Sequence, residues 1–259
     1  TKCSGYCKSG KTKNASKNMN SALDFETFGH LHNIILLVTF GIFFFLPWVG
    51  KNFLNDKYRS YVVYFLIAIS LAQDLLYDLY QLSINDFDLG DDLPLHICGL
   101  SLYLSTYALW KKDQLAFELA YFWGVTAAFN ALLTPDPTRF AYGNLDIFSH
   151  FLSHGLVVLN VIWLVWVQSM RCRKGSFFKT LGISTIAMSI IGVINFIIGN
   201  GANYWFLSQK PVTESPFVQG EWPFYILGVY IAGVIFFVVA YIPMMFVLKI
   251  ENKRGTSNY

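Results

Sequence analysis

The chain has 259 residues, of which 54% are hydrophobic, 18% aromatic and 14% charged, and its mean hydropathy is +0.44. An ordinary soluble domain carries about 25% charged residues, so this composition excludes a single water-soluble globule. The net charge of +3, from 19 Lys and Arg against 16 Asp and Glu, is too small and too scattered for a nucleic-acid-binding surface. We therefore expect an integral membrane protein.

Apolar stretches suited to membrane spans recur along the chain, separated by short charged or Pro/Gly-rich joints. A spanning helix needs about 20 mostly apolar residues. The third stretch is short and opens with polar groups, so a six-span count is the alternative to seven. The fold class predicted is all-α, a polytopic membrane helix bundle. Its helices are expected at 28–49, 60–81, 94–110, 115–134, 147–170, 177–199 and 223–249.

The charges of the joints alternate and predict an orientation. Lys and Arg in short loops mark the cytoplasmic side, and here they follow the first, third, fifth and seventh stretches, whereas the other joints are acidic or neutral. Seven helices then place the N-terminus outside and the C-terminus in the cytoplasm, and a short unfolded tail can cross despite its lysines. The basic residues concerned are Lys51, Lys57, Arg59, Lys111, Lys112, Arg171, Arg173, Lys174, Lys179, Lys249, Lys253 and Arg254.

Three parts are expected along the chain: a flexible Lys-rich tail at 1–24, one transmembrane helical domain at 25–250, and a short cytoplasmic tail at 251–259. Residues 5–12 match the phosphate-loop pattern G-x-x-x-x-G-K-[ST]. That loop works between a buried strand and a helix, and no strand is expected before it, so the match does not predict nucleotide binding. Cys3 and Cys7 lack further ligands nearby for a zinc site.

All five histidines map to helix ends on the predicted non-cytoplasmic side. His150 and His154 are four residues apart and share a helix face. Such a cluster suits two chemistries. One is a metal site, in which His96, His150 and His154 hold a zinc ion that activates a bound water. The set is His30, His32, His96, His150 and His154.

The second chemistry uses Cys98 as a nucleophile. A cysteine nucleophile needs a base within reach and gains from a helix N-terminus. Cys98 follows Pro94 in the first or second turn of its predicted helix, although a lone cysteine between apolar residues is more often a packing residue.

Acidic residues inside the predicted spans also call for partners. An Asp at the centre of a membrane helix costs about 2.5–3.5 kcal/mol. Asp74 and Asp78, one helical turn apart, and Glu118 are therefore expected to face the bundle interior, either at a working site near the histidines or as interhelical hydrogen-bonding groups. Lys210 either holds a phosphate headgroup or is simply solvated.

Polar and aromatic side chains mark the end of the sixth stretch. Asn195, Asn200 and Asn203 are expected to face the bundle interior or to form the turn that ends the helix. Tyr204 and Trp205 are expected in the aromatic belt at the membrane interface.

Several motifs occur in order between about His30 and Tyr241, and together they resemble the YwaF-type bacterial integral membrane proteins, which are related to the transmembrane protein 164 family. The motifs are Leu93-Pro94-Leu95-His96-Ile97-Cys98, Tyr121-Phe122-Trp123-Gly124 with Ala131-Leu132-Leu133-Thr134-Pro135-Asp136, His154-Gly155, Asn203-Tyr204-Trp205-Phe206-Leu207 with Lys210-Pro211, and Trp222-Pro223-Phe224-Tyr225.

The resemblance implies an activity. The eukaryotic relatives are acyltransferases that move an acyl chain between phospholipids with a cysteine and a histidine, which match Cys98 and His154, with His150 as the next candidate for the base. An acyl thioester on Cys98 is then the expected intermediate. His96 and Asn203 are expected to polarise the carbonyl or hold the ring.

Further contributions are expected around that centre. Asp78 is expected to orient an imidazole, and Asp74, Asp78, Asn203 and Lys210 are the expected substrate-binding residues. Membrane lipids are the expected partners, with no nucleic acid and no cofactor, in a bacterial cytoplasmic membrane.

Two other readings stay open. One is a non-catalytic membrane subunit, held by partner subunits in a larger assembly, or a small-molecule binding or transport protein. The other is a metal-dependent lipid hydrolase that uses zinc on His96, His150 and His154.

Overall fold

A computed structural model describes residues 25–140, 142–199, 201–211 and 218–253. The predicted tail at 1–24, its phosphate-loop pattern and its two cysteines lie outside these residues, as do Asn200 and most of the predicted C-terminal tail. Within the described residues the structure contains helices and no strands. They are α2 (His30–Asn52), α3 (Asp56–Ser83), α4 (Ile97–Lys111), α5 (Gln114–Trp123), the π-helix η1 (Gly124–Ala128), α6 (Phe129–Leu133), the 3-10 helix η2 (Pro137–Arg139), α7 (Asn144–Trp166), α8 (Ser176–Ile198), the 3-10 helix η3 (Tyr204–Phe206) and α9 (Phe224–Lys253).

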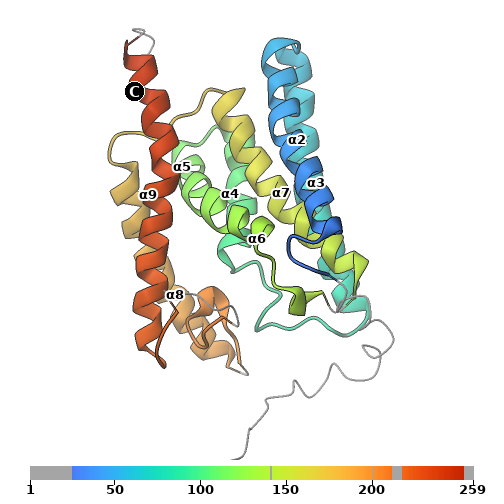
Figure 1. Ribbon diagram of the computed structural model, residues 1–259, viewed down its shortest axis with the longest axis vertical. Coiled ribbons are helices and arrows are strands. Elements are labelled where there is room, and N and C mark those ends of the chain that lie inside the picture. The colour runs from blue at the N-terminus through green and yellow to red at the C-terminus, as the bar shows by residue number, and fades with distance from the viewer. Residues whose placement is uncertain (1–24, 141, 200, 212–217, 254–259) are drawn as a thin grey trace, which may run out of the picture.

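Six helical stretches among the described residues are long and apolar enough to cross a membrane: α2, α3, the continuous stretch Gln114–Leu133, α7, α8 and α9. The expected all-α multi-pass architecture is confirmed, with the six-span count. The predicted span that does not reach this length is α4, which has 15 residues; it is the stretch that was short and opened with polar groups. Helix α4 still runs alongside the others in the centre of the bundle (Figure 1).

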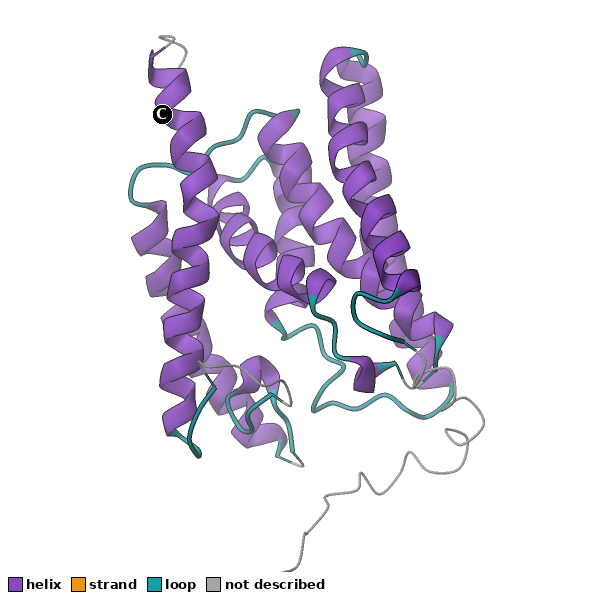
Figure 2. Cartoon of the chain, viewed as in Figure 1, coloured by secondary structure: helices purple, strands orange, loops and turns teal. Residues whose placement is uncertain are grey.

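The arrangement has a pair of helices on each side and a central group (Figures 1 and 2). The α2–α3 pair lies on one side, α8 and α9 lie on the other, and α4 to α7 lie between them. Helix α7 packs against α2, α3, α4 and α5, and 61% of its most apolar window is buried, against 11% for α8. The centre of the fold is therefore the α4–α5–α7 unit, and α8 presents most of its surface outward.

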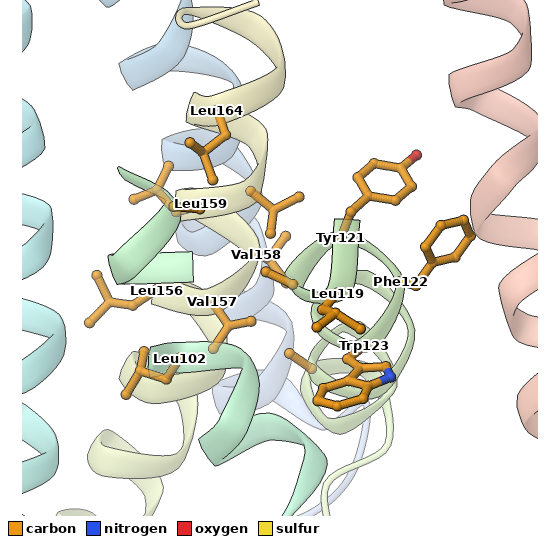
Figure 3. Close-up of a cluster of buried hydrophobic side chains, with 14 of the residues drawn as sticks. Leu102, Leu119, Tyr121, Phe122, Trp123, Leu156, Val157, Val158, Leu159 and Leu164 are labelled. Carbon is orange, nitrogen blue, oxygen red and sulfur yellow. The ribbon is translucent and has the colours of Figure 1, made fainter. Parts of the chain in front are cut away.

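Apolar side chains of the three central helices converge in one core (Figure 3). Leu102 comes from α4, Phe122 from α5, and Val157 from α7, and all three side chains are completely buried. Because lipid tails are as apolar as these side chains, their burial stabilises the bundle through close van der Waals packing. The lipid-facing surfaces of α2, α3, α8 and α9 instead expose many large apolar side chains, such as Phe196 at 87%, as expected for a protein in a bilayer.

Helix ends at the connections are capped by side chains that the sequence supplies. The Asn55 side chain accepts a hydrogen bond from the Tyr58 N–H at the start of α3, and Asp113 does the same for Ala116 at the start of α5. Arg59 donates to the carbonyl oxygens of Gly50 and Lys51, each at 2.9 Å. These bonds satisfy backbone groups that helix ends leave open.

The span Gln114–Leu133 contains a π-helical turn at Gly124–Ala128. A Cβ atom on Gly124 would lie 2.7 Å from Cγ1 of Val157 and 3.7 Å from Cβ of Ser101. Glycine is therefore required where α5 passes closest to α4 and α7. The irregular turn sits just before α6, which leads into the histidine-bearing end of the bundle.

Candidate functional site

The site lies at one end of the bundle, which we call the histidine end. Among the described residues it is formed by 84–96, 134–140, 142–143, 199, 201–211 and 218–223. The opposite end, formed by residues 53–55, 112–113 and 167–175 together with the end of α9, is the basic end (Figure 1). The histidine end carries the first turns of α2, α4 and α7. The five histidines lie on these turns or within three turns of them.

His150 and His154 form a stacked pair on α7. Their ring centroids are 4.3 Å apart. Nδ1 of His154 contacts the carbonyl oxygen of His150 at 2.7 Å, and Nε2 of His150 contacts the carbonyl oxygen of Ala131 at 3.0 Å. A carbonyl only accepts, so each of these ring nitrogens carries the proton. In the neutral His154 ring, Nε2 is therefore the atom with the free lone pair.

His32 has a structural role. Its side chain is completely buried, and Nδ1 accepts a hydrogen bond from the Phe28 N–H at 2.8 Å while Nε2 donates to the Leu132 carbonyl oxygen at 2.8 Å. Both nitrogens are thus used to join the start of α2 to the end of α6. His30, two residues earlier, is exposed.

His96 is the N-cap residue of α4 and takes part in an ionic cluster. Its Nε2 lies 3.3 Å from Oδ1 of Asp91, and Nη2 of Arg139 lies 3.2 Å from the same oxygen. The His96 ring also packs against Tyr204, with ring centroids 4.8 Å apart. Arg139 was not singled out from the sequence, yet it lies within electrostatic range of Cys98, His150 and His154.

Cys98 lies in the first turn of α4, half-buried and free of disulfide bonding. Burial raises the pKa of its thiol, and Arg139 acts in the opposite direction. The resting thiol is therefore protonated at neutral pH and needs a base to react. Cys172, the other free cysteine described, is fully buried in the loop before α8 at the basic end.

Of the two aspartates on α3, Asp74 is hydrogen-bonded to α4. Tyr103 donates a hydrogen bond to Oδ2 of Asp74 at 2.5 Å. Asp78 interacts electrostatically with Asp74 and Asp92. Among the described residues no histidine is hydrogen-bonded to either aspartate, so the structure does not show the predicted pairing of Asp78 with an imidazole.

Asn203 and Lys210 lie in the loop after α8. The Asn203 side chain accepts from the N–H groups of Ser208 and Gln209 and donates to the Gln209 carbonyl oxygen. These bonds fold the loop back on itself. Lys210 lies 3.9 Å from Glu221, and both side chains are more than half exposed.

Tyr204 and Trp205 are buried, at 0% and 8% exposure, so their expected place in an interfacial belt is wrong. The Tyr204 hydroxyl donates to the Leu89 carbonyl oxygen and accepts from the Leu93 N–H, and the Trp205 indole donates to the Leu95 carbonyl oxygen. Burial raises the pKa of Tyr204 to about 12, so this hydroxyl remains a donor. The pair fixes the segment that leads to His96 and Cys98.

Buried Asn195 in turn holds Tyr204 by its backbone. From the sequence, Asn195 was predicted only to be an interior polar residue. No local pattern indicates that its side chain bonds the backbone of Tyr204, which lies nine residues later and beyond the end of α8.

The histidine cluster does not fit the zinc alternative as it stands. The described residues contain no group of three or more His, Cys, Asp or Glu side chains placed to hold a metal ion. His96 contacts Asp91 in a cluster with Arg139, whereas His150 and His154 pack against each other on α7.

Comparisons with known proteins give one match. Searches of curated proteins and of solved structures find no similar chain. A family model described as the TMEM164 family matches residues 27–241, which covers all the helices described except the last turns of α9 and includes every residue of the site. The match and the six apolar helices identify an integral multi-pass membrane protein that belongs to the TMEM164 family.

Proposed function

We propose that this protein transfers a fatty-acyl chain between phospholipids through a thioester on Cys98, with His154 as the base. The observation that carries the proposal is the fixed tautomer of His154. Its Nδ1–H is held by the His150 carbonyl oxygen, so Nε2 is the atom available to accept a proton. A base of this kind is what a buried, protonated thiol requires.

Two further features support the pairing. Cys98 lies in the first turn of α4, where the helix dipole stabilises a thiolate. Arg139 lies within electrostatic range of Cys98, and its positive charge favours the thiolate.

The reaction has two halves. In the first, His154 Nε2 removes the proton from Cys98, Sγ attacks the ester carbonyl carbon of a phospholipid, and the C–O bond breaks. The lysophospholipid oxygen leaves with the proton from His154. In the second, His154 takes the proton of an acceptor lysophospholipid hydroxyl, whose oxygen attacks the thioester, and Cys98 leaves and is reprotonated.

Intact-protein mass spectrometry tests the proposal. Wild type, Cys98→Ala and Cys172→Ala are incubated with phospholipid and then treated with hydroxylamine, which cleaves thioesters. We expect an acyl adduct on wild type and Cys172→Ala that hydroxylamine removes, and none on Cys98→Ala. An adduct that persists in Cys98→Ala, or acyl transfer at the wild-type rate in that variant, contradicts the proposal.

The bacterial cytoplasmic membrane is the proposed location. A stoichiometric metal in a protein without adduct would favour the hydrolase reading, and the absence of both would favour a binding protein or a subunit.

A further inference from the structure

A second polar site lies at the basic end of the bundle, on the opposite side of the membrane domain from Cys98. It is a pocket of about 210 Å³ between the start of α5 and the loop that leads into α8. The residues that line it are Glu118, Arg173, Lys174, Gly175, Ser176 and Lys179. Three of these six side chains are cationic and one is anionic, so the pocket has an excess of positive charge.

The carboxylate of Glu118 organises the pocket without neutralising it. The side chain is 1% exposed, and Oε1 accepts hydrogen bonds from the Gln114 side chain at 2.9 Å and from the Arg173 N–H at 3.1 Å. The charged groups of Arg173 and Lys179 lie 3.7 Å from its oxygens, and both side chains are about half exposed. At this distance Glu118 holds the two cations in place while their N–H donors remain open to an anion.

The α8 N-terminus opens on the same pocket and has no anionic partner of its own. Gly175 adopts φ +86° just before the helix, and α8 has neither a side-chain cap nor an acidic residue in its first turn. The first N–H groups of a 23-residue helix favour an anion there.

The Ser176 hydroxyl contributes a further polar group to the pocket wall. Ser176 is 2% exposed and lines the pocket, and its side chain interacts with the Cys172 thiol and the Tyr241 hydroxyl. A serine hydroxyl can accept a hydrogen bond and donate its own proton at the same time, so Oγ can accept from either group and donate to an anion in the pocket.

From these features we propose that the pocket binds a phosphate group, through Arg173, Lys174, Lys179, the Ser176 hydroxyl and the α8 N-terminus. Two sources carry this chemistry: the headgroup of an anionic phospholipid in the leaflet at the basic end, and inorganic phosphate. The site is separate from the proposed acyl-transfer centre, and its binding is measured without any turnover.

The test uses the full chain in phosphatidylcholine nanodiscs. In one arm phosphatidic acid is added, and the lipid retained by the protein is counted by native mass spectrometry. In the other arm inorganic phosphate is titrated, and the rise in melting temperature is followed. Arg173→Gln/Lys179→Gln is compared with Lys249→Gln/Lys253→Gln, which removes the same charge from exposed positions at the same end.

We expect the first double variant to weaken binding at least about tenfold, as loss of charge-assisted hydrogen bonds does, and the second to change it little. Ser176→Ala is the milder variant and should weaken binding several-fold. Binding of phosphatidic acid alone assigns a lipid headgroup, and binding of inorganic phosphate assigns free phosphate. No binding in either arm, or equal loss in both double variants, overturns the proposal.

Discussion

Asn195 and Tyr204 form a reciprocal pair in which one side-chain amide satisfies both backbone groups of the other residue. Nδ2 of Asn195 donates to the Tyr204 carbonyl oxygen at 2.9 Å, and Oδ1 accepts from the Tyr204 N–H at 3.0 Å. Tyr204 in turn bonds the backbone of Leu89 and Leu93. The end of α8 therefore positions the segment that precedes Cys98.

Asn195→Ala should destabilise the protein by about 2–4 kcal/mol, because it leaves a buried N–H and a buried carbonyl unsatisfied at about 1–3 kcal/mol each. The measurement is the melting temperature in detergent. Asn52→Ala is the matched control, since Asn52 is exposed and makes a single bond to Trp48. Equal melting temperatures for the two variants would contradict a stabilising role for the Asn195–Tyr204 hydrogen bonds.

His32→Ala should lower stability, in contrast to its neighbour His30. His32 is completely buried with both nitrogens bonded to backbone, so its loss leaves a cavity and two unsatisfied groups, at a cost of about 2–4 kcal/mol. His30→Ala, at an exposed position, should change stability by less than about 0.5 kcal/mol. Thermal unfolding of both variants checks this, and a stable His32→Ala protein would contradict the structural role.

Gly50→Ala and Gly41→Ala on α2 should differ in sign. A Cβ on Gly50 would lie 2.5 Å from the ring of Trp163 on α7, whereas a Cβ on Gly41 would meet nothing within 4 Å. Overpacking costs about 1–3 kcal/mol, and a helical Gly→Ala without contacts gains about 0.4–1 kcal/mol. Melting temperatures that move in the same direction would mean that α2 and α7 do not pack as described.

Arg171→Lys should be destabilising although it keeps the charge. The buried Arg171 guanidinium contacts Glu251 at 2.7 Å and donates to the carbonyl oxygens of Val165 and Met170. A lysine cannot reproduce this fork, and leaving the Val165 and Met170 carbonyl oxygens without their donors should cost about 1–3 kcal/mol. The free energy of unfolding measures the effect. Lys253→Arg, exposed in the last turn of α9, is the control and should be neutral.

The sequence predicted the architecture better than the site. Apolar length and the alternation of charged joints are local signals, and they located α2, α3, α7, α8 and α9 to within a few residues. The span predicted at 115–134 likewise matches the continuous stretch Gln114–Leu133, whose end is set by Pro135 and Pro137, because proline stops a helix. The π-helical turn had no local signal, since Gly124 is required by Val157 on another helix.

The site was predicted only in its residue types. Histidines at helix ends are visible in the sequence, but which nitrogen each uses depends on carbonyl groups such as that of Ala131, brought close by folding. Arg139 belongs to no sequence motif that would have indicated a place near Cys98. Tyr204 and Trp205 were predicted to be interfacial aromatic residues, because their burial depends on contacts with distant segments of the chain.

The short length of α4 sets the depth of Cys98. Its 15 residues extend about 22 Å, whereas the hydrocarbon layer is about 30 Å thick. If α4 stands upright with Lys111 at one boundary of the hydrocarbon layer, Cys98 lies about 8 Å short of the other boundary. Irregular backbone at that depth must find its hydrogen bonds within the protein. Tyr204 and Trp205 supply such bonds to the residues before Cys98.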